Sequence, residues 1–197
     1  MTASIRVALM AAALGVVGMV ACGNPTGLTA SFSTITDTFQ LYTLNSAPQG
    51  APNAVYTFGF QTSGSLGVRA GSGLAFDVAL DLTPDGKVVL YPVRRVANAL
   101  GRGHQVGLQV ANGTFESLTS APRNGYTYDS TKTVSVGQAV AYEANNSASC
   151  QFSYNGYSVY GKLVVDSVDI AQQKLYVRAT VNPNCGFRSF APGVPKN

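Results

Sequence analysis

The chain has 197 residues, a formal net charge of +4 and 11% charged residues, less than half of the roughly 25% in an average soluble domain. The small net charge and the lack of a long charge run argue against a nucleic-acid partner. Three cysteines are too few for a disulfide-dense scaffold. The chain has no C-x-x-C motif and a single histidine, so we expect no metal and no cofactor.

Residues 1–21 have the features of a secretory signal peptide. Arg6 supplies a basic start, residues 7–21 are an uncharged apolar run, and small residues precede Cys22. The run is shorter than the roughly 20 apolar residues that a membrane-spanning helix needs. The sequence therefore predicts an exported protein whose leader is removed.

Met19-Val20-Ala21-Cys22 resembles the lipobox of bacterial lipoproteins, in which Leu commonly stands where this chain has Met19. The resemblance implies cleavage before Cys22 and a diacylglyceryl group on its sulfur. It also implies attachment to a membrane of the bacterial cell envelope through that N-terminal lipid. Gly23 stands where some inner-membrane lipoproteins have Asp, which favours the outer membrane. The alternative is an ordinary signal peptide, with Cys22 only close to the cleavage site.

Residues 22–34 are rich in Gly, Asn, Pro, Thr and Ser, a composition typical of a flexible tether. A single domain is expected over residues 35–197. Its first strand candidates are the aromatic-rich segments 36–44 and 54–62, which flank a proline-containing loop at 46–53.

The strongest period-two pattern lies at 74–82, where apolar residues alternate with Ala and Asp. Strict alternation predicts a half-buried strand, with Asp77 and Asp81 on its solvated face. The following Thr-Pro-Asp-Gly sequence at 83–86 is typical of a tight turn, so 87–93 is expected to complete a hairpin.

Residues 93–100 are the one candidate for a helical turn after the leader. Segment 104–111 alternates again and is expected to be a strand. Asn112-Gly113 is a strong hairpin signal, which predicts that 114–119 pairs back onto 104–111.

Two short strands are expected within 131–144, on either side of Gly137. A last hairpin is expected from 161–168 to 174–181. These segments amount to about nine or ten strands with few helices, which predicts an all-β fold and favours an antiparallel β-sandwich. A small closed β-barrel is the alternative architecture.

If Cys22 carries a lipid, two cysteines are left, Cys150 and Cys185. Export places them in a compartment where disulfides persist, so we expect a Cys150–Cys185 bridge. Two free thiols are the alternative.

His104 lies on the same side of its predicted strand as Val106 and Leu108. We therefore expect it to cap the end of a buried strand face, and a catalytic role is the alternative. Asp77 and Asp81 are roughly 13 Å apart along a strand, which is too far for a retaining glycosidase pair.

The chain offers two candidate recognition surfaces. One consists of four tyrosines in Gly- and Asn-rich segments, a composition typical of adaptable binding loops: Tyr126, Tyr128, Tyr154 and Tyr157. The other consists of basic residues close to His104: Arg94, Arg95 and Arg102. Packing around the disulfide and a solvated basic loop are the respective alternatives.

The sequence thus favours a lipid-anchored envelope protein with a non-catalytic binding or scaffolding role. An envelope protein or a glycan is the expected partner, and the oligomeric state stays open. The alternatives are a lipocalin-like carrier of a small apolar ligand and an envelope hydrolase with an unrecognised carboxylate site.

Overall fold

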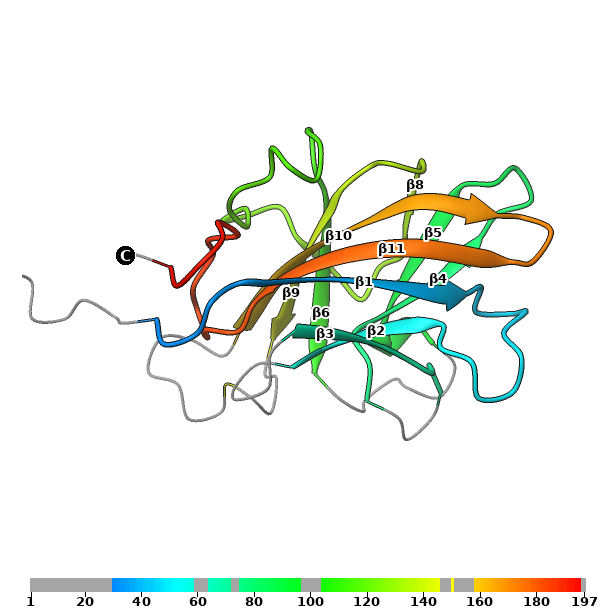
Figure 1. The fold of residues 1–197 in the computed structure, drawn as a ribbon, viewed down its shortest axis with the longest axis horizontal. Helices are drawn as coiled ribbons and strands as arrows, with labels where there is room; N and C mark the ends of the chain where they lie inside the picture. Colours follow the sequence, from blue (N-terminus) through cyan, green and yellow to red (C-terminus); the bar gives the residue numbers. More distant parts are fainter. Residues whose placement is uncertain are drawn as a thin grey trace, which may run out of the picture. The chain divides into compact units, whose positions relative to one another are not determined.

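The computed structural model describes residues 30–58, 64–71, 75–96, 104–145, 150 and 158–195. All of these residues belong to one compact unit, Ala30–Lys196. Within the described residues the fold is all-β, with eleven strands and one short 3-10 helix, η1 (Val93–Arg95) (Figure 1). The last residues of two predicted segments lie outside the described residues: 59–62 of the segment 54–62, and 97–100 of the segment 93–100.

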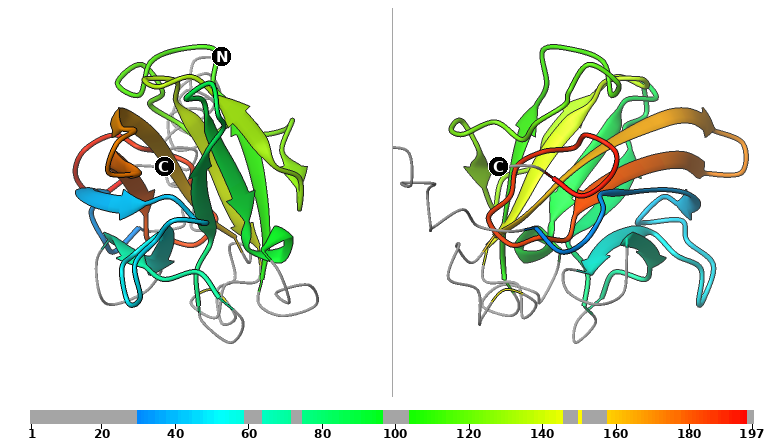
Figure 2. Two further views of the ribbon diagram at one scale, coloured as in Figure 1. Left: turned by 90° about the vertical axis from the view of Figure 1, so that its right-hand side faces the viewer. Right: turned by 60° about the vertical axis from the view of Figure 1, so that its left-hand side comes forward.

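The larger sheet has six antiparallel strands, and β10 and β11 form its longest hairpin. In spatial order the strands are β1 (Ile35–Tyr42), β11 (Lys174–Asn182), β10 (Ser158–Asp169), β9 (Val140–Asn145), β6 (Gln105–Val110) and β7 (Thr127–Tyr128). Figure 1 and Figure 2 both show β1 in blue beside the orange β10–β11 hairpin. The hairpin expected over 161–168 and 174–181 is therefore confirmed.

The smaller sheet has five antiparallel strands. In spatial order they are β3 (Gly64–Val68), β2 (Ala54–Phe58), β4 (Val78–Leu82), β5 (Val88–Pro92) and β8 (Lys132–Val134). The predicted hairpin around 83–86 is confirmed, and Gly86 takes the left-handed conformation (φ 78°) that this turn requires. The two sheets do not close into a barrel, so the β-sandwich is the correct choice of the two architectures.

The space between the sheets is filled by side chains from both of their inner faces. The largest fully buried ones include Leu41, Val55, Phe76, Leu80, Leu90, Leu108, Tyr142, Leu163 and Leu175. Tyr142, on β9, shares a hydrogen bond of 2.7 Å with the hydroxyl of Thr57 on β2 of the other sheet. Because both groups are buried, this bond links the sheets in a medium of low dielectric constant.

The edge strands β1 and β3 approach each other without pairing. The Asp37 carboxylate on β1 accepts a hydrogen bond of 2.7 Å from the Ser65 backbone N–H on β3. An edge N–H that is capped by a carboxylate is less available to a strand from another chain. This contact closes one side of the sandwich with a side chain in place of a strand ladder.

A second layer covers part of the outer face of the six-stranded sheet. It is made by the loop 111–126 and the C-terminal segment 183–195, which are joined by a bridge between Ser120 and Ser189 (Figure 1). Lys162, on β10 and 5% exposed, donates to the carbonyls of Phe115 and Leu118, the latter at 2.9 Å. Its ammonium lies 4.3 Å from the centre of the Phe115 ring. Burial lowers the pKa of Lys162, and the two carbonyls compensate the buried charge.

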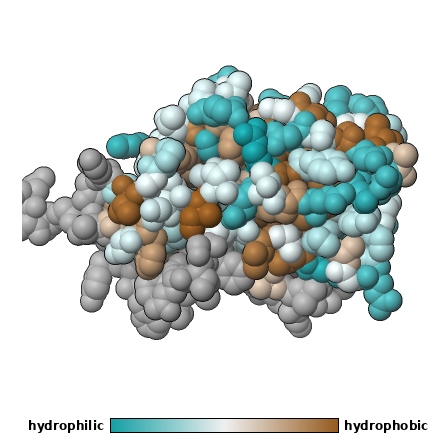
Figure 3. Space-filling view, in the orientation of Figure 1, coloured by the Kyte–Doolittle hydropathy of each residue, from teal (hydrophilic) through white to brown (hydrophobic). Residues whose placement is uncertain are grey.

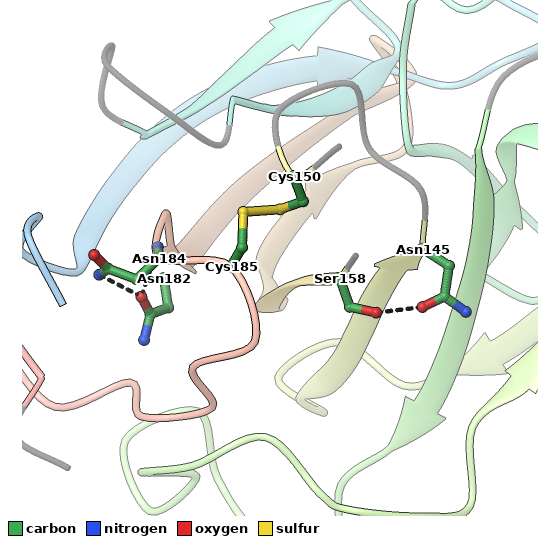
Figure 4. Close-up of a disulfide and its surroundings, with 6 residues drawn as sticks. All are labelled: Asn145, Cys150, Ser158, Asn182, Asn184 and Cys185. Carbon is green, nitrogen blue, oxygen red and sulfur yellow. Dashed lines mark hydrogen bonds between the residues drawn. A yellow bond between two sulfur atoms is a disulfide. The ribbon is translucent and has the colours of Figure 1, made fainter. Parts of the chain in front are cut away.

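The predicted Cys150–Cys185 disulfide is present (Figure 4). It connects Cys150, which lies between β9 and β10, to the segment that follows β11. Nearby, Asn184 accepts hydrogen bonds from the backbone of Ser31 and Phe32 at 2.8 and 3.0 Å. The end of the segment expected to be a tether is therefore held against the domain.

The hairpin expected at Asn112-Gly113 is wrong. Residues 114–119 form no strand, and β6 pairs instead with β7 and β9. Phe115, 6% exposed, packs against Ala139 and Val164 on the outer face of the sheet. Burial of this aromatic ring in the second layer draws the segment away from the β6 edge.

The solvated face expected for Asp77 and Asp81 is also wrong, since they are 1% and 6% exposed. The chain that follows β1 runs along β4, where the Leu44 N–H donates to the Leu80 carbonyl at 2.8 Å. Asn45, from the same stretch, donates to the Asp81 carboxylate. Both faces of β4 are buried, which its period-two pattern did not indicate.

Strand pairing departs from the expectations in two further places. The Gly-containing strand β3 was not predicted. The two strands expected on either side of Gly137 exist, but β8 belongs to the five-stranded sheet and β9 to the six-stranded sheet. Gly137, at φ 83°, lies in the turn where the chain crosses between the sheets.

Candidate functional site

A row of polar side chains crosses four strands on the outer face of the six-stranded sheet. The register places Tyr128 on β7 opposite Gly107 on β6, Gly107 opposite Glu143 on β9, and Glu143 opposite Tyr160 on β10. A methyl group at position 107 would lie 2.7 Å from Cε1 of Tyr128, so the tyrosine ring lies across this glycine. The absence of a side chain at Gly107 lets Tyr128 reach Glu143 two strands away.

Glu143 is the acceptor at the centre of this row. Its Oε2 accepts from the Tyr128 hydroxyl at 2.5 Å, and its Oε1 accepts from the Tyr160 hydroxyl at 2.8 Å. Arg188 donates from Nη2 to the Tyr160 hydroxyl oxygen at 2.6 Å, and its guanidinium lies 4.2 Å from the centre of the Tyr160 ring. With Glu143 only 8% exposed, these contacts hold a nearly buried carboxylate in one orientation.

Tyr126 completes the group, which we call the tyrosine cluster: Tyr126, Tyr128, Glu143, Tyr160 and Arg188. The rings of Tyr126 and Tyr160 are 6.5 Å apart between centres. The Tyr126 hydroxyl is buried, and within the described part of the chain it has no hydrogen-bond partner. The two tyrosines that the structure describes from the predicted recognition loops are thus brought together.

Burial keeps the hydroxyls of the tyrosine cluster protonated. Burial and the neighbouring Glu143 carboxylate raise the pKa of Tyr160 to about 12 and also raise the pKa of Tyr128. The pKa of Tyr126 is raised by the same two causes, in the same order. At neutral pH the tyrosines are therefore hydrogen-bond donors and not phenolate nucleophiles or bases.

A second polar group joins the two sheets. His104, which precedes β6, contacts the Asp77 carboxylate through Nε2, and Asp77 precedes β4 in the other sheet. Asp77 also accepts a hydrogen bond of 2.6 Å from the Thr57 backbone N–H. Burial opposes the charged imidazole, but the hydrogen bond and charge of Asp77 outweigh it and raise the pKa of His104. The histidine therefore bridges the sheets at the end of the buried face, as its strand parity predicted.

The predicted basic cluster is partly neutralised in the fold. Arg94 lies 3.5 Å from the Asp129 carboxylate, measured from Nη1 to Oδ2, and Gln105 donates to the same Oδ2 at 3.3 Å. Arg95 is exposed. Arg102, the third residue of this basic cluster, lies outside the described residues. The same is true of Tyr154 and Tyr157 from the predicted tyrosine surface, and of the predicted lipidation site, Cys22.

Sequence reasoning missed Glu143, Tyr160 and Arg188. They lie on β9, on β10 and after β11, and only the strand register aligns them. One signal in the sequence could have placed Tyr160. In the sequence Tyr-Gly-Lys, a period of two puts Tyr160 on the same strand face as the charged Lys162.

The fold and the disulfide define the class of the protein as an all-β domain of two antiparallel sheets packed as a sandwich. No protein-family model matches the sequence, and no curated protein or solved structure is significantly similar to it. Within the described ranges, no helix is long and apolar enough to cross a membrane. Among these same residues, no three His, Cys, Asp or Glu side chains are grouped to hold a metal ion.

Proposed function

We propose that the protein is a lipid-anchored component of the bacterial cell envelope that binds an envelope partner, without catalysis, through the tyrosine cluster. The observation that carries the proposal is the arrangement of Tyr126, Tyr128 and Arg188 around a fixed, nearly buried carboxylate. Tyrosine and arginine are enriched in the central residues of binding interfaces, because they combine large contact area with directional hydrogen bonds.

The anchor is supported by the apolar run at 7–21 and by the lipobox-like sequence that ends at Cys22. The disulfide is consistent with export, because such bonds persist mainly in oxidising compartments. Two acyl chains on Cys22 are enough for stable attachment, whereas one alone is marginal. The outer membrane is the favoured location, because Gly23 stands where some inner-membrane lipoproteins have Asp.

A role for the surface of the domain, and not for its interior, is supported by the contents of the sandwich. The space between the sheets is occupied by apolar side chains, so a lipocalin-like carrier lacks the barrel on which that alternative depends. The polar groups of the tyrosine cluster hydrogen-bond chiefly to one another, which suits a preorganised contact surface.

The anchor is tested by cell fractionation and mass spectrometry of the mature protein. We expect a membrane-bound chain that begins at acylated Cys22, and we expect Cys22→Ser to leave the membrane fraction. A mature chain that begins elsewhere, or a membrane-bound Cys22→Ser variant, contradicts the anchor.

The binding surface is tested separately by photo-crosslinking in cells, with benzoylphenylalanine introduced at Tyr128. The matched control carries the same group at Thr133, which is exposed on β8 of the other sheet. A discrete adduct at position 128 and none at 133 is expected, and protease digestion then distinguishes a protein partner from a glycan. No adduct at 128, or equal adducts at both positions, contradicts the proposal.

A further inference from the structure

A β-bulge interrupts the β10–β11 ladder on the outer face of the larger sheet. The register shifts between Val165 and Ser167, which leaves Asp166 without a partner residue on β11. Bulges commonly re-aim a side chain, and here the Asp166 carboxylate meets Arg178 of β11. Its Oδ2 accepts from Arg178 Nε at 2.7 Å, and its Oδ1 accepts from Nη2 at 2.8 Å.

Arg178 is itself held on two further sides. Its Nη1 donates to Glu116 Oε1 at 2.8 Å, and its guanidinium lies 4.7 Å from the centre of the Phe115 ring. The Asp166 carboxylate is therefore fixed in a planar two-bond contact with a guanidinium that it shares with Glu116. Because its side chain is 40% exposed, the oxygens still face solvent and can accept further hydrogen bonds.

An open pocket of about 260 Å³ adjoins this carboxylate, lined by Thr38, Phe39, Asp166, Tyr176 and Val177. Tyr176 is 44% exposed. The hydroxyls of Thr38 and Tyr176 have no hydrogen-bond partner within the described part of the chain. In the space-filling view, hydrophobic residues form separate patches between hydrophilic ones (Figure 3). The pocket therefore combines an exposed ring, free hydroxyls and a fixed acceptor.

We propose that this pocket is a subsite for a neutral saccharide chain. A sugar ring offers an apolar face of C–H groups that can stack on Tyr176, and hydroxyls at its edge that can donate to Asp166. The volume lies just below the roughly 300–1,000 Å³ of pockets that enclose a whole drug-sized ligand, so it suits one ring of a longer chain. Because Arg178 and the nearby Lys162 together balance the charges of Asp166 and Glu116, a neutral ligand fits better than a cation.

The neighbouring side chains on the same face also offer an aromatic ring and polar groups along the strands. Gln40 of β1 is exposed and lies opposite Tyr176, and the next pair is Tyr42 with Lys174, whose ammonium is 5.4 Å from the ring centre. A peptide that added to the sheet would instead use the backbone of the edge strand. The alternation of rings with amide, hydroxyl and charged groups favours a saccharide laid on the face.

The subsite is separate from the tyrosine cluster. Asp166 and Tyr160 lie on the same strand but roughly 20 Å apart at the usual rise per residue. Lys162 and the loop that covers it lie between them. Binding at one surface can therefore be removed without altering the other.

The test is a titration of the full chain, carrying Cys22→Ser for solubility, with three probes: chitohexaose, maltohexaose and cellohexaose. Binding is followed by calorimetry and by the amide NMR signals of β1 and β11. We expect at least one probe to bind and to shift the signals around Tyr176. No binding of any of the three at millimolar concentrations overturns the proposal.

Variants locate the site on the probe that binds. Tyr176→Ala is expected to weaken affinity by about tenfold or more, whereas Tyr176→Phe, which keeps the ring, changes it by less than about threefold. Thr133→Ala, at an exposed position on β8 of the other sheet, is the control and is expected to bind as the parent does. Equal losses for Tyr176→Ala and Thr133→Ala, or an unchanged affinity for Tyr176→Ala, overturn the proposal.

Discussion

Two tyrosines in this protein lie directly over strand glycines, one on each face of the same sheet. Tyr142 covers Gly161 in the core, and Tyr128 covers Gly107 on the outer face. Glycine weakens a strand because it leaves a bare backbone, and an aromatic ring from the neighbouring strand replaces the missing contact. In both cases the ring also delivers its hydroxyl to a distant hydrogen-bond partner, Thr57 or Glu143.

At the residue scale, we predict that Gly161→Ala strongly destabilises the domain. The added methyl group would lie 2.1 Å from Cζ of Tyr142, which is fully buried and has no room to retreat. Overpacking of this kind costs about 1–3 kcal/mol and occasionally more. The free energy of unfolding in urea is the measurement. The control is Gly113→Ala, whose added methyl group would meet the exposed Ser117 hydroxyl, which can rotate away. Equal stabilities of the two variants would contradict the prediction.

At the scale of elements, the two sheets are linked by polar contacts as well as by the apolar core. His104 before β6 meets Asp77 before β4, and the hydroxyl of Tyr142 on β9 meets Thr57 on β2. Because these pairs are nearly buried, removing one member leaves the other without its partner in a medium of low dielectric constant. The packing of the two sheets therefore depends on a few specific polar residues.

The His104–Asp77 pair predicts a pH dependence of stability. The pKa of His104 is raised in the folded state, so its contribution is fully present below the unfolded value of about 6.5. It is lost as pH rises through the folded pKa. The histidine is the single one in the chain, and Cys150 and Cys185 do not titrate in the disulfide.

We therefore expect His104→Gln to lose more stability at about pH 5 than at about pH 9. Urea unfolding of the wild type and the variant at both pH values measures this difference. A loss of the same size at both pH values would show that the imidazole charge has no role.

At the scale of the whole molecule, the chain termini of the domain are held by a few cross-links. The disulfide joins the β9–β10 connection to the segment after β11, and Asn184 in that segment holds Ser31 and Phe32 (Figure 4). Thr34 forms a bridge with Gly193. The segment that leads from the predicted anchor therefore enters the domain beside the disulfide.

We predict that the disulfide contributes substantially to stability. It closes a loop with a sequence separation of 35 residues, which corresponds to about 3–4 kcal/mol in the chain-entropy model. For a domain of this size, that is a shift in Tm of roughly 6–16 °C. Thermal unfolding of Cys22→Ser with and without reductant is the measurement. The Cys150→Ser/Cys185→Ser variant should melt at the reduced value and should not respond to reductant.

The sequence alone determined the all-β class, both long hairpins and the cysteine pairing, because alternation, turn residues and cysteine number are local or countable properties. It also singled out Tyr126 and Tyr128 by the composition of their loops. Only the tertiary structure decided that Asp77 and Asp81 are buried, that β8 and β9 belong to different sheets, and that Glu143, Tyr160 and Arg188 join those tyrosines. The reason is physical: a period of two indicates which residues share a face of one strand, whereas the partners of that face are selected by long-range register and by loops that pack over it.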